Sequence, residues 1–154
     1  LLNAYNALEY GEANGREDLA ANARSIFDSY LRYGFTPGGL LREVVDFKRG
    51  RETDVYSIRR QSEGVYATLY YLNYEKKKGR KHPEWEKRLK GMLDTFLRLQ
   101  NEDGSFPRKF KDDFSIVDKS GGSTPSATLP LVMGYKYFKD KRYLEAARHS
   151  VDYL

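Results

Sequence analysis

A helical pattern that recurs along the chain constrains the fold of these 154 residues more than any other feature. Ala67-Thr68-Leu69 returns as Ala127-Thr128-Leu129, an offset of 127 − 67 = 60 residues. Each copy starts with a segment that is apolar on nearly every side, followed by a segment with a single apolar side. A helix that is apolar all round is buried among neighbours, whereas a one-sided helix lies on a surface. The pattern predicts inner and outer helices in alternation.

The outer segment of the first copy shows the one-sided pattern clearly. Its apolar residues recur at helical spacing, with charged residues between them: Trp85, Leu89, Met92, Leu93, Phe96 and Leu97. A third copy precedes these two, because Ala23-Arg24 and Asp28 are spaced as Ala147-Arg148 and Asp152 are, and an apolar segment at residues 1–10 comes before it. The repeat unit is therefore an inner helix, a short turn, an outer helix and a long loop.

The sequence QNEDGSF at residues 100–106 ends the second outer helix, which begins near Pro83. Asn101, Asp103 and Gly104 favour turn and left-handed conformations, and Pro107 prevents a helical continuation. We expect Phe106 to fold back against the hairpin. The turn would then direct the following loop across one end of the molecule.

Repeated inner and outer helices with their long loops at one end resemble the α/α toroids of the six-hairpin glycosidase-like superfamily. QNEDGSF is similar to the Q-x-x-D-G-S-[FW] turn where an outer helix of such toroids ends. The resemblance implies an all-α fold in which residues 1–154 form a single α/α-hairpin domain of two and a half to three hairpins. It implies an incomplete ring, with the missing hairpins in the rest of a larger parent chain. Terpenoid-cyclase toroids fit less well, because no D-x-D-D acid is present and the chain has a single tryptophan.

Two long loops, residues 34–62 and 103–124, would meet at the ligand end of such a toroid. We expect Ser62 to cap the second inner helix, which would place Glu63 in its first turn at the cavity mouth. Glu63 and Asp54 are the predicted catalytic pair, one protonating a leaving oxygen and the other activating water or attacking. Structural alternatives are an ion pair of Glu63 with a neighbouring arginine and a turn role for Asp54.

Further residues of these loops are predicted to bind substrate through aromatic stacking, guanidinium groups and hydrogen bonds. They are Tyr56, Arg59, Arg60, Gln61, Phe106, Arg108, Phe110, Asp112 and Thr124. Thr124 and Pro125 read as the N-cap and first residue of an inner helix. Pro130, six residues later, predicts a kink or a late start of that helix.

Composition narrows the chemistry. The chain has no cysteine, and its two histidines have no carboxylate at metal-ligand spacing, so we predict no metal site and no cofactor. The +5 net charge is scattered, which argues against nucleic acid as a partner. The longest uncharged run, residues 120–135, is too short to span a membrane, so no membrane partner is expected. The basic turn KKKGRKH at residues 76–82 reads as solvated. A periplasmic or secreted bacterial protein is what the resemblance favours.

The resemblance implies a carbohydrate-active enzyme, glycoside hydrolase-like, that cleaves oligo- or polysaccharides, including acidic ones, with a pair of carboxylates. One alternative is a toroid polysaccharide lyase, in which a tyrosine such as Tyr56 and an arginine remove a proton beside a uronate. Another is a non-catalytic helical scaffold that binds a glycan or a protein. The position of Glu63 distinguishes them, since a hydrolase needs it to face a second carboxylate across a pocket.

Overall fold

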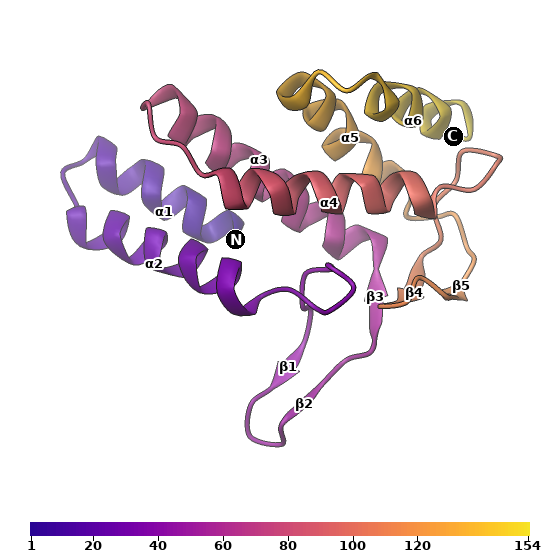
Figure 1. The fold of residues 1–154 in the computed structure, drawn as a ribbon, viewed down its shortest axis with the longest axis horizontal. Coiled ribbons are helices and arrows are strands. Elements are labelled where there is room, and N and C mark those ends of the chain that lie inside the picture. Colours follow the sequence, from indigo (N-terminus) through magenta and orange to yellow (C-terminus); the bar gives the residue numbers. More distant parts are fainter.

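Six helices form three helical hairpins in the computed structural model, which describes residues 1–154. The helices are α1 (Leu2–Ala13), α2 (Glu17–Tyr33), α3 (Ile58–Lys77), α4 (Pro83–Leu99), α5 (Thr124–Phe138) and α6 (Lys141–Asp152). The first and third hairpins lie on opposite sides of the second (Figure 1). The predicted repeat of helical hairpins is confirmed.

The inner layer consists of α1, α3 and α5. Helix α3 packs against both α1 and α5, while α2, α4 and α6 each pack against the inner helix that precedes them. Five members of the predicted stripe on α4 are at most 2% exposed: Trp85, Leu89, Met92, Leu93 and Phe96. The alternation of helix types in the sequence therefore translates into the predicted inner and outer layers. None of the helices is both long and apolar enough to cross a membrane.

The inner helices keep one side open. Tyr70 on α3 is 41% exposed and Leu129 on α5 is 53% exposed. Tyr70 stacks on Tyr5 of α1, with the ring centroids 5.5 Å apart. Large apolar side chains on the surface of inner helices are what an incomplete ring would leave uncovered.

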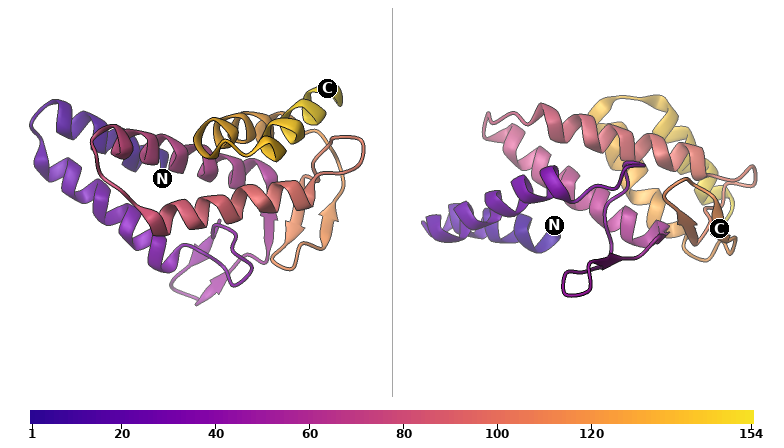
Figure 2. Two further views of the ribbon diagram at one scale, coloured as in Figure 1. Left: turned by 45° about the horizontal axis from the view of Figure 1, so that its top comes forward. Right: turned by 60° about the horizontal axis from the view of Figure 1, so that its bottom comes forward.

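The long loops contain two small antiparallel sheets that the sequence did not predict. The strands are β1 (Val45–Asp46), β2 (Arg51–Glu52), β3 (Val55–Ser57), β4 (Lys109–Lys111) and β5 (Ile116–Asp118). β1 pairs with β2, and β3, β4 and β5 form the second sheet. The β3–β4 pairing places Tyr56 opposite Phe110 and so joins the first long loop to the second. The strands lie together at one end of the helices (Figure 2).

Two inner helices begin earlier than the sequence predicted. Helix α3 starts at Ile58, capped by Ser57, whose hydroxyl accepts from Arg60 N at 3.4 Å; the prediction of Ser62 as the cap was wrong. The reason is that β3 pairs with β4 and holds Ser57 in the extended conformation that a cap requires. Helix α5 starts at Thr124 and continues through Pro130 to Phe138, so no late start occurs there.

The turn after α4 has the predicted form. Gly104 adopts a φ of +88°, and the Asp103 carboxylate accepts hydrogen bonds from Ser105 N at 2.9 Å and Ser105 Oγ at 2.6 Å. Phe106 is fully buried and packs edge-on against Phe96 of α4. The turn thereby fixes the start of the second long loop against the helices.

Candidate functional site

A cavity of about 580 Å³ lies where the two long loops meet the N-terminal end of α3. Its wall includes the paired strands β3 and β4, because Ser57 and Lys109 face each other across them. The charged side chains that line the cavity are Glu43, Arg59, Arg60, Glu63, Arg108 and Lys109. The cavity therefore lies at the loop end of the helices, where the sequence predicted a ligand site.

Glu43 is the most buried of these charged groups, with 4% of its side chain exposed. Its Oε1 accepts from Ser57 N at 2.8 Å and from Gln61 Nε2 at 3.1 Å. Its Oε2 has only longer contacts, to Ser57 Oγ at 3.4 Å and to Arg60 Nη1 at 3.5 Å. One oxygen is thus fixed by the backbone while the other is held more loosely.

Glu43 was not predicted from the sequence as a residue of the site. The signal in the sequence was a glutamate at residues 40–45, a loop stretch in which every other residue except Arg42 is apolar. An acid placed among apolar residues in a loop needs hydrogen-bond donors when it is buried. Those donors come from the start of α3, whose position was itself not predicted correctly.

Glu63 also lines the cavity, although in the second turn of α3 and not in the first. Its side chain is 50% exposed and accepts from Arg59 Nε at 3.1 Å. An ion pair of Glu63 with a neighbouring arginine was the structural alternative to its catalytic role. The side chain borders the neighbouring cavity of about 300 Å³ as well, so it stands between the two.

Four other predicted residues line the main cavity, namely Tyr56, Arg59, Arg60 and Arg108. Tyr56 is 3% exposed, and its hydroxyl donates to Thr53 O at 3.1 Å. Burial, followed by the nearby carboxylates, raises the pKa of Tyr56. A phenol held protonated in this way is a poor base, which weighs against the lyase alternative.

Asp54 is exposed and is not among the residues that line the cavity. It follows the β1–β2 hairpin directly, and its neighbours Thr53 and Val55 reach the cavity instead. No hydrogen bond or ion pair involves its side chain. The structure therefore does not bring Asp54 and Glu63 together as the predicted catalytic pair.

Several residues predicted to contact substrate serve the protein interior. Phe106 and Phe110 are fully buried, so neither presents a ring for stacking. Gln61 is 1% exposed and bonds to the backbone of Leu41 through both ends of its amide, at 2.9 and 2.8 Å. These side chains shape the wall of the cavity from behind, because β4 points Phe110 inward and Lys109 outward.

Asp112 and Thr124 connect backbone segments. The Asp112 carboxylate accepts from the Thr36 hydroxyl and from Gly38 N, the latter at 2.9 Å, which ties the two long loops together. Thr124 is the first residue of α5 and not its cap, which is Ser123. Its hydroxyl accepts from Phe106 N at 2.9 Å, so it holds the turn after α4.

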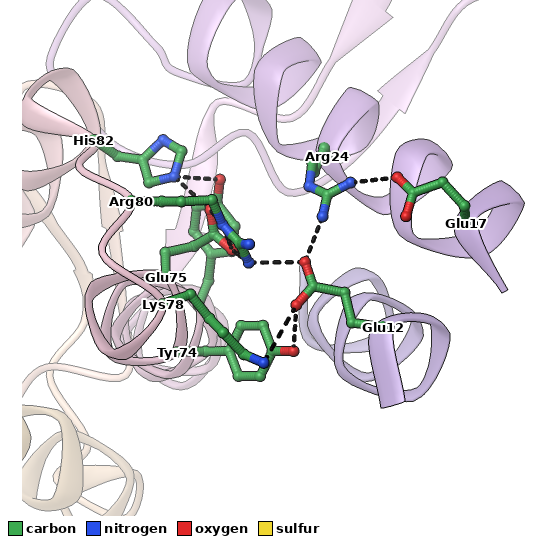
Figure 3. Close-up of polar contacts among 9 residues, drawn as sticks. Glu12, Glu17, Arg24, Tyr74, Glu75, Lys78, Arg80 and His82 are labelled. Carbon is green, nitrogen blue, oxygen red and sulfur yellow. Dashed lines mark hydrogen bonds and ion pairs between the residues drawn. The ribbon is translucent and has the colours of Figure 1, made fainter. Parts of the chain in front are cut away.

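A second polar cluster lies at the opposite, short-turn end of the helices (Figure 3). Arg80 donates to Glu75 at 2.6 Å and to Glu12 of α1 at 2.8 Å, and His82 Nε2 lies 2.7 Å from Glu75. Glu12 also accepts from the Tyr74 hydroxyl at 2.6 Å, and burial together with this bond raises the pKa of Tyr74 to about 12. The lysines of this turn are exposed, as the sequence predicted, whereas Arg80 and His82 are partly buried because they contact Glu75 of α3 and, for Arg80, also Glu12 of α1.

No group of three or more metal-ligating side chains comes together in the structure. The charged residues around the main cavity are arginines, one lysine and two glutamates, a set suited to hydrogen bonds with hydroxyl and anionic groups. The arrangement can position a polar ligand at a loop rim and offer it carboxylates.

Comparison with known proteins identifies the fold of the chain through similar solved structures. No protein-family model and no curated protein matches the sequence. Among solved structures, the cellobiose 2-epimerase of Bacillus thermoamylovorans B4167 matches with a TM-score of 0.77 at 14% identity. A sugar epimerase from a ruminal bacterium matches with a TM-score of 0.72 at 17% identity. Both matches cover 97% of this chain and 38% of the epimerase chain.

The chain has the fold of part of an α/α toroid, with three helical hairpins. The predicted fold class is thereby confirmed, including the incomplete ring, since three hairpins are present and the chain spans 38% of the length of the two epimerases. In this toroid the cavity lies at the rim where the long loops gather, and the Glu12–Arg80–Glu75 cluster lies at the other rim.

Proposed function

We propose that this toroid segment belongs to a carbohydrate-active enzyme and that the cavity at its loop rim binds an oligo- or polysaccharide. The observation that carries the proposal is the cavity itself, which is lined by guanidinium, carboxylate and hydroxyl groups where the long loops meet α3. Such groups pair with the many hydroxyls of a sugar. The fold adds support, because the two solved structures named above are a cellobiose 2-epimerase and a sugar epimerase. The remaining hairpins would come from the rest of the parent chain.

Hydrolysis of a glycosidic bond is the reaction we propose first. Glu63 supplies a half-exposed carboxylate at the cavity. For the second carboxylate we propose Glu43 ahead of Asp54, because Glu43 lines the cavity and its Oε2 has only long contacts. One acid would protonate the leaving oxygen, and the other would activate water or attack the sugar.

Epimerisation is the second candidate. The similarity to two structures named as epimerases favours it, although fold similarity at 14% and 17% identity supports a protein class more than a reaction. A non-catalytic glycan-binding scaffold is the third, and the ion pair between Glu63 and Arg59 favours it. All three candidate functions include binding of a saccharide, and they differ in the reaction, if any, that follows binding.

Product analysis of the full-length protein with a panel of saccharides separates these candidates. Hydrolysis yields new reducing ends. Epimerisation leaves the mass of the saccharide unchanged in ordinary water, and in deuterated water it replaces a carbon-bound hydrogen by deuterium. Binding without either product supports the scaffold. Failure to bind any saccharide would contradict the proposal as a whole.

Three variants then assign the carboxylates. Glu63→Gln and Glu43→Gln should each lower turnover by about a hundredfold or more if they act as acid and base, whereas Asp54→Asn should leave it within about twofold. The opposite result for Asp54 and Glu43 would restore the pair predicted from the sequence. Unchanged turnover in Glu63→Gln would remove Glu63 from the reaction.

A further inference from the structure

The wall formed by β3 and β4 presents an unpaired cation to the cavity. Lys109 pairs in register with Ser57, and both line the cavity, while the intervening Phe110 points into the core. The Lys109 side chain makes no ion pair and no hydrogen bond, although it is the cavity's only lysine. Asp118 is its register partner on β5, yet the ion pair of Asp118 is with Arg108, at 3.7 Å. The Lys109 ammonium, which has no ion pair of its own, is therefore available to bind a group on a ligand.

The other cations of the cavity are only partly neutralised. Arg108 lies 3.7 Å from Asp118, which is outside the cavity lining, and 58% of the Arg108 side chain is exposed. Arg59 and Arg60 each have one carboxylate partner, Glu63 at 3.1 Å and Glu43 at 3.5 Å. Four cations minus two carboxylates leaves the lining with a net charge of +2.

The backbone adds to this positive field. Arg59 and Arg60 lie in the first turn of α3, a helix of 20 residues whose N-terminal end carries a partial positive charge and faces the cavity. The first turn itself contains no acidic residue, although the Glu43 carboxylate accepts from Ser57 N at the start of the helix. The helix end and the arginines therefore both contribute positive potential, of which Glu43 offsets a part.

We infer that the saccharide bound here carries an anionic substituent, a carboxylate or a sulfate ester on the sugar, and that Lys109 and Arg108 bind it. This inference rests on the proposal that the cavity binds a saccharide. Lys109, the first residue of β4, and Arg108, which precedes it, offer a point charge and a planar guanidinium, which together suit an oxyanion. The two pairings Arg59–Glu63 and Arg60–Glu43 leave these two as the cations most available to it.

Calorimetric binding to the full-length protein tests this with matched ligands. The probes are a galacturonate trisaccharide, its methyl ester, which has the same rings without the charge, and a sulfated galactose trisaccharide. We expect the methyl ester to bind about tenfold more weakly than the acid, and the difference to shrink in high salt. Tighter binding of the acid or of the sulfated sugar identifies which substituent the cavity takes.

Lys109→Met removes the charge while keeping the length of the side chain. It should weaken binding of the acidic or sulfated probe by about tenfold and leave the methyl ester unchanged. Lys111→Met is the matched control, because Lys111 lies on the same strand and is exposed but does not line the cavity. Both positions are exposed, so neither substitution should affect folding, which circular dichroism verifies.

The outcomes separate the two proposals. Equal affinity of the acid and its methyl ester would overturn the anionic-substituent inference and leave the proposed saccharide function standing. Equal losses in Lys109→Met and Lys111→Met would overturn it too, because overall charge and not the cavity would then be responsible. If the protein bound none of these three saccharides and no neutral saccharide either, the result would count against the proposed function as well.

Discussion

Arg80 donates from Nε to both carboxylate oxygens of Glu75, each at 3.0 Å, and 1% of the Glu75 side chain is exposed. The same guanidinium reaches Glu12 on α1 through Nη2 at 2.8 Å, so one side chain links the first hairpin to the second (Figure 3). His82 Nε2 also lies 2.7 Å from Glu75 Oε2. The buried charge of Glu75 therefore depends on donors from the turn that follows its own helix.

Replacing Arg80 by methionine should lower the free energy of unfolding by about 2 kcal/mol, because it leaves the Glu75 carboxylate buried with His82 as its remaining side-chain partner. Urea denaturation of the full-length protein measures this. Lys81→Met is the control, since Lys81 is exposed in the same turn and has no ion pair; it should change stability by less than about 0.5 kcal/mol. Equal effects of the two substitutions would show that the pairing of Arg80 contributes little.

The same cluster should make stability depend on acidity. Burial alone raises the pKa of Glu75, but hydrogen bonds from Arg80 and His82 more than offset it, so the pKa lies below its usual value of 4.5. The pKa of Glu12 is also lowered, since bonds from Tyr74 and Arg80 outweigh its burial. A depressed folded-state pKa contributes stability that is present above the unfolded value and is lost as pH falls through the folded value.

We therefore expect the free energy of unfolding to fall as the solution is acidified from about pH 5 to about pH 3, with part of the fall due to these two groups. Glu75→Gln should be less stable than the wild type at neutral pH and lose less on acidification. Glu102→Gln, which removes an exposed carboxylate in a turn, should keep the wild-type acid dependence. Parallel curves for wild type and Glu75→Gln would exclude Glu75 as a contributor.

Asp112 should control the mobility of the two long loops. Asp112→Ala removes the acceptor for Thr36 Oγ1 and Gly38 N, which leaves the hydroxyl of the buried Thr36 without that acceptor at a cost of about 1 to 2 kcal/mol. Hydrogen exchange at residues 36–41 should rise as a result. Asp113→Ala is the matched control, because Asp113 bonds only within its own turn, to Ser115 at 2.9 and 2.6 Å. Equal exchange in the two variants would mean that Asp112 does not tie the loops.

The layers of the toroid could be predicted because they depend on local periodicity. The stripe on α4 and the charge-free stretch of α3 encode which side of each helix is buried, whatever the partner. The turn at Asp103 and Gly104 was also predictable, because its hydrogen bonds close within a few residues. Such features need no knowledge of distant segments.

The candidate site was harder to predict because its details depend on pairing across the chain. The start of α3 at Ile58, capped by Ser57, is set by β3 pairing with β4, more than 50 residues away. Glu43 obtains its donors from that helix start. Phe110 was predicted to bind substrate because an aromatic residue in a polar loop suggests exposure, yet strand pairing turns it inward. Likewise, Arg80 is neutralised by Glu12 from another hairpin.

The turn after α4 offers a test of how closely the hairpins fit. A Cβ on Gly104 would lie 2.1 Å from the carbonyl oxygen of His149 on α6, and the residue also has a φ of +88°. Gly15 has a φ of +66° with no other atom within 4 Å of such a Cβ, so Gly15→Ala reports the conformational cost alone, about 1 kcal/mol. Gly104→Ala should cost about 3 kcal/mol, because backbone must also move apart.

Urea denaturation of the two glycine variants, with hydrogen exchange at residues 141–152, measures both parts of this difference. We expect faster exchange in α6 for Gly104→Ala alone, since the displaced group belongs to that helix. Equal destabilisation by the two substitutions would mean that α6 does not pack closely on the turn. In that case the turn would owe its form to its own hydrogen bonds, and its role in seating the third hairpin would be disproved.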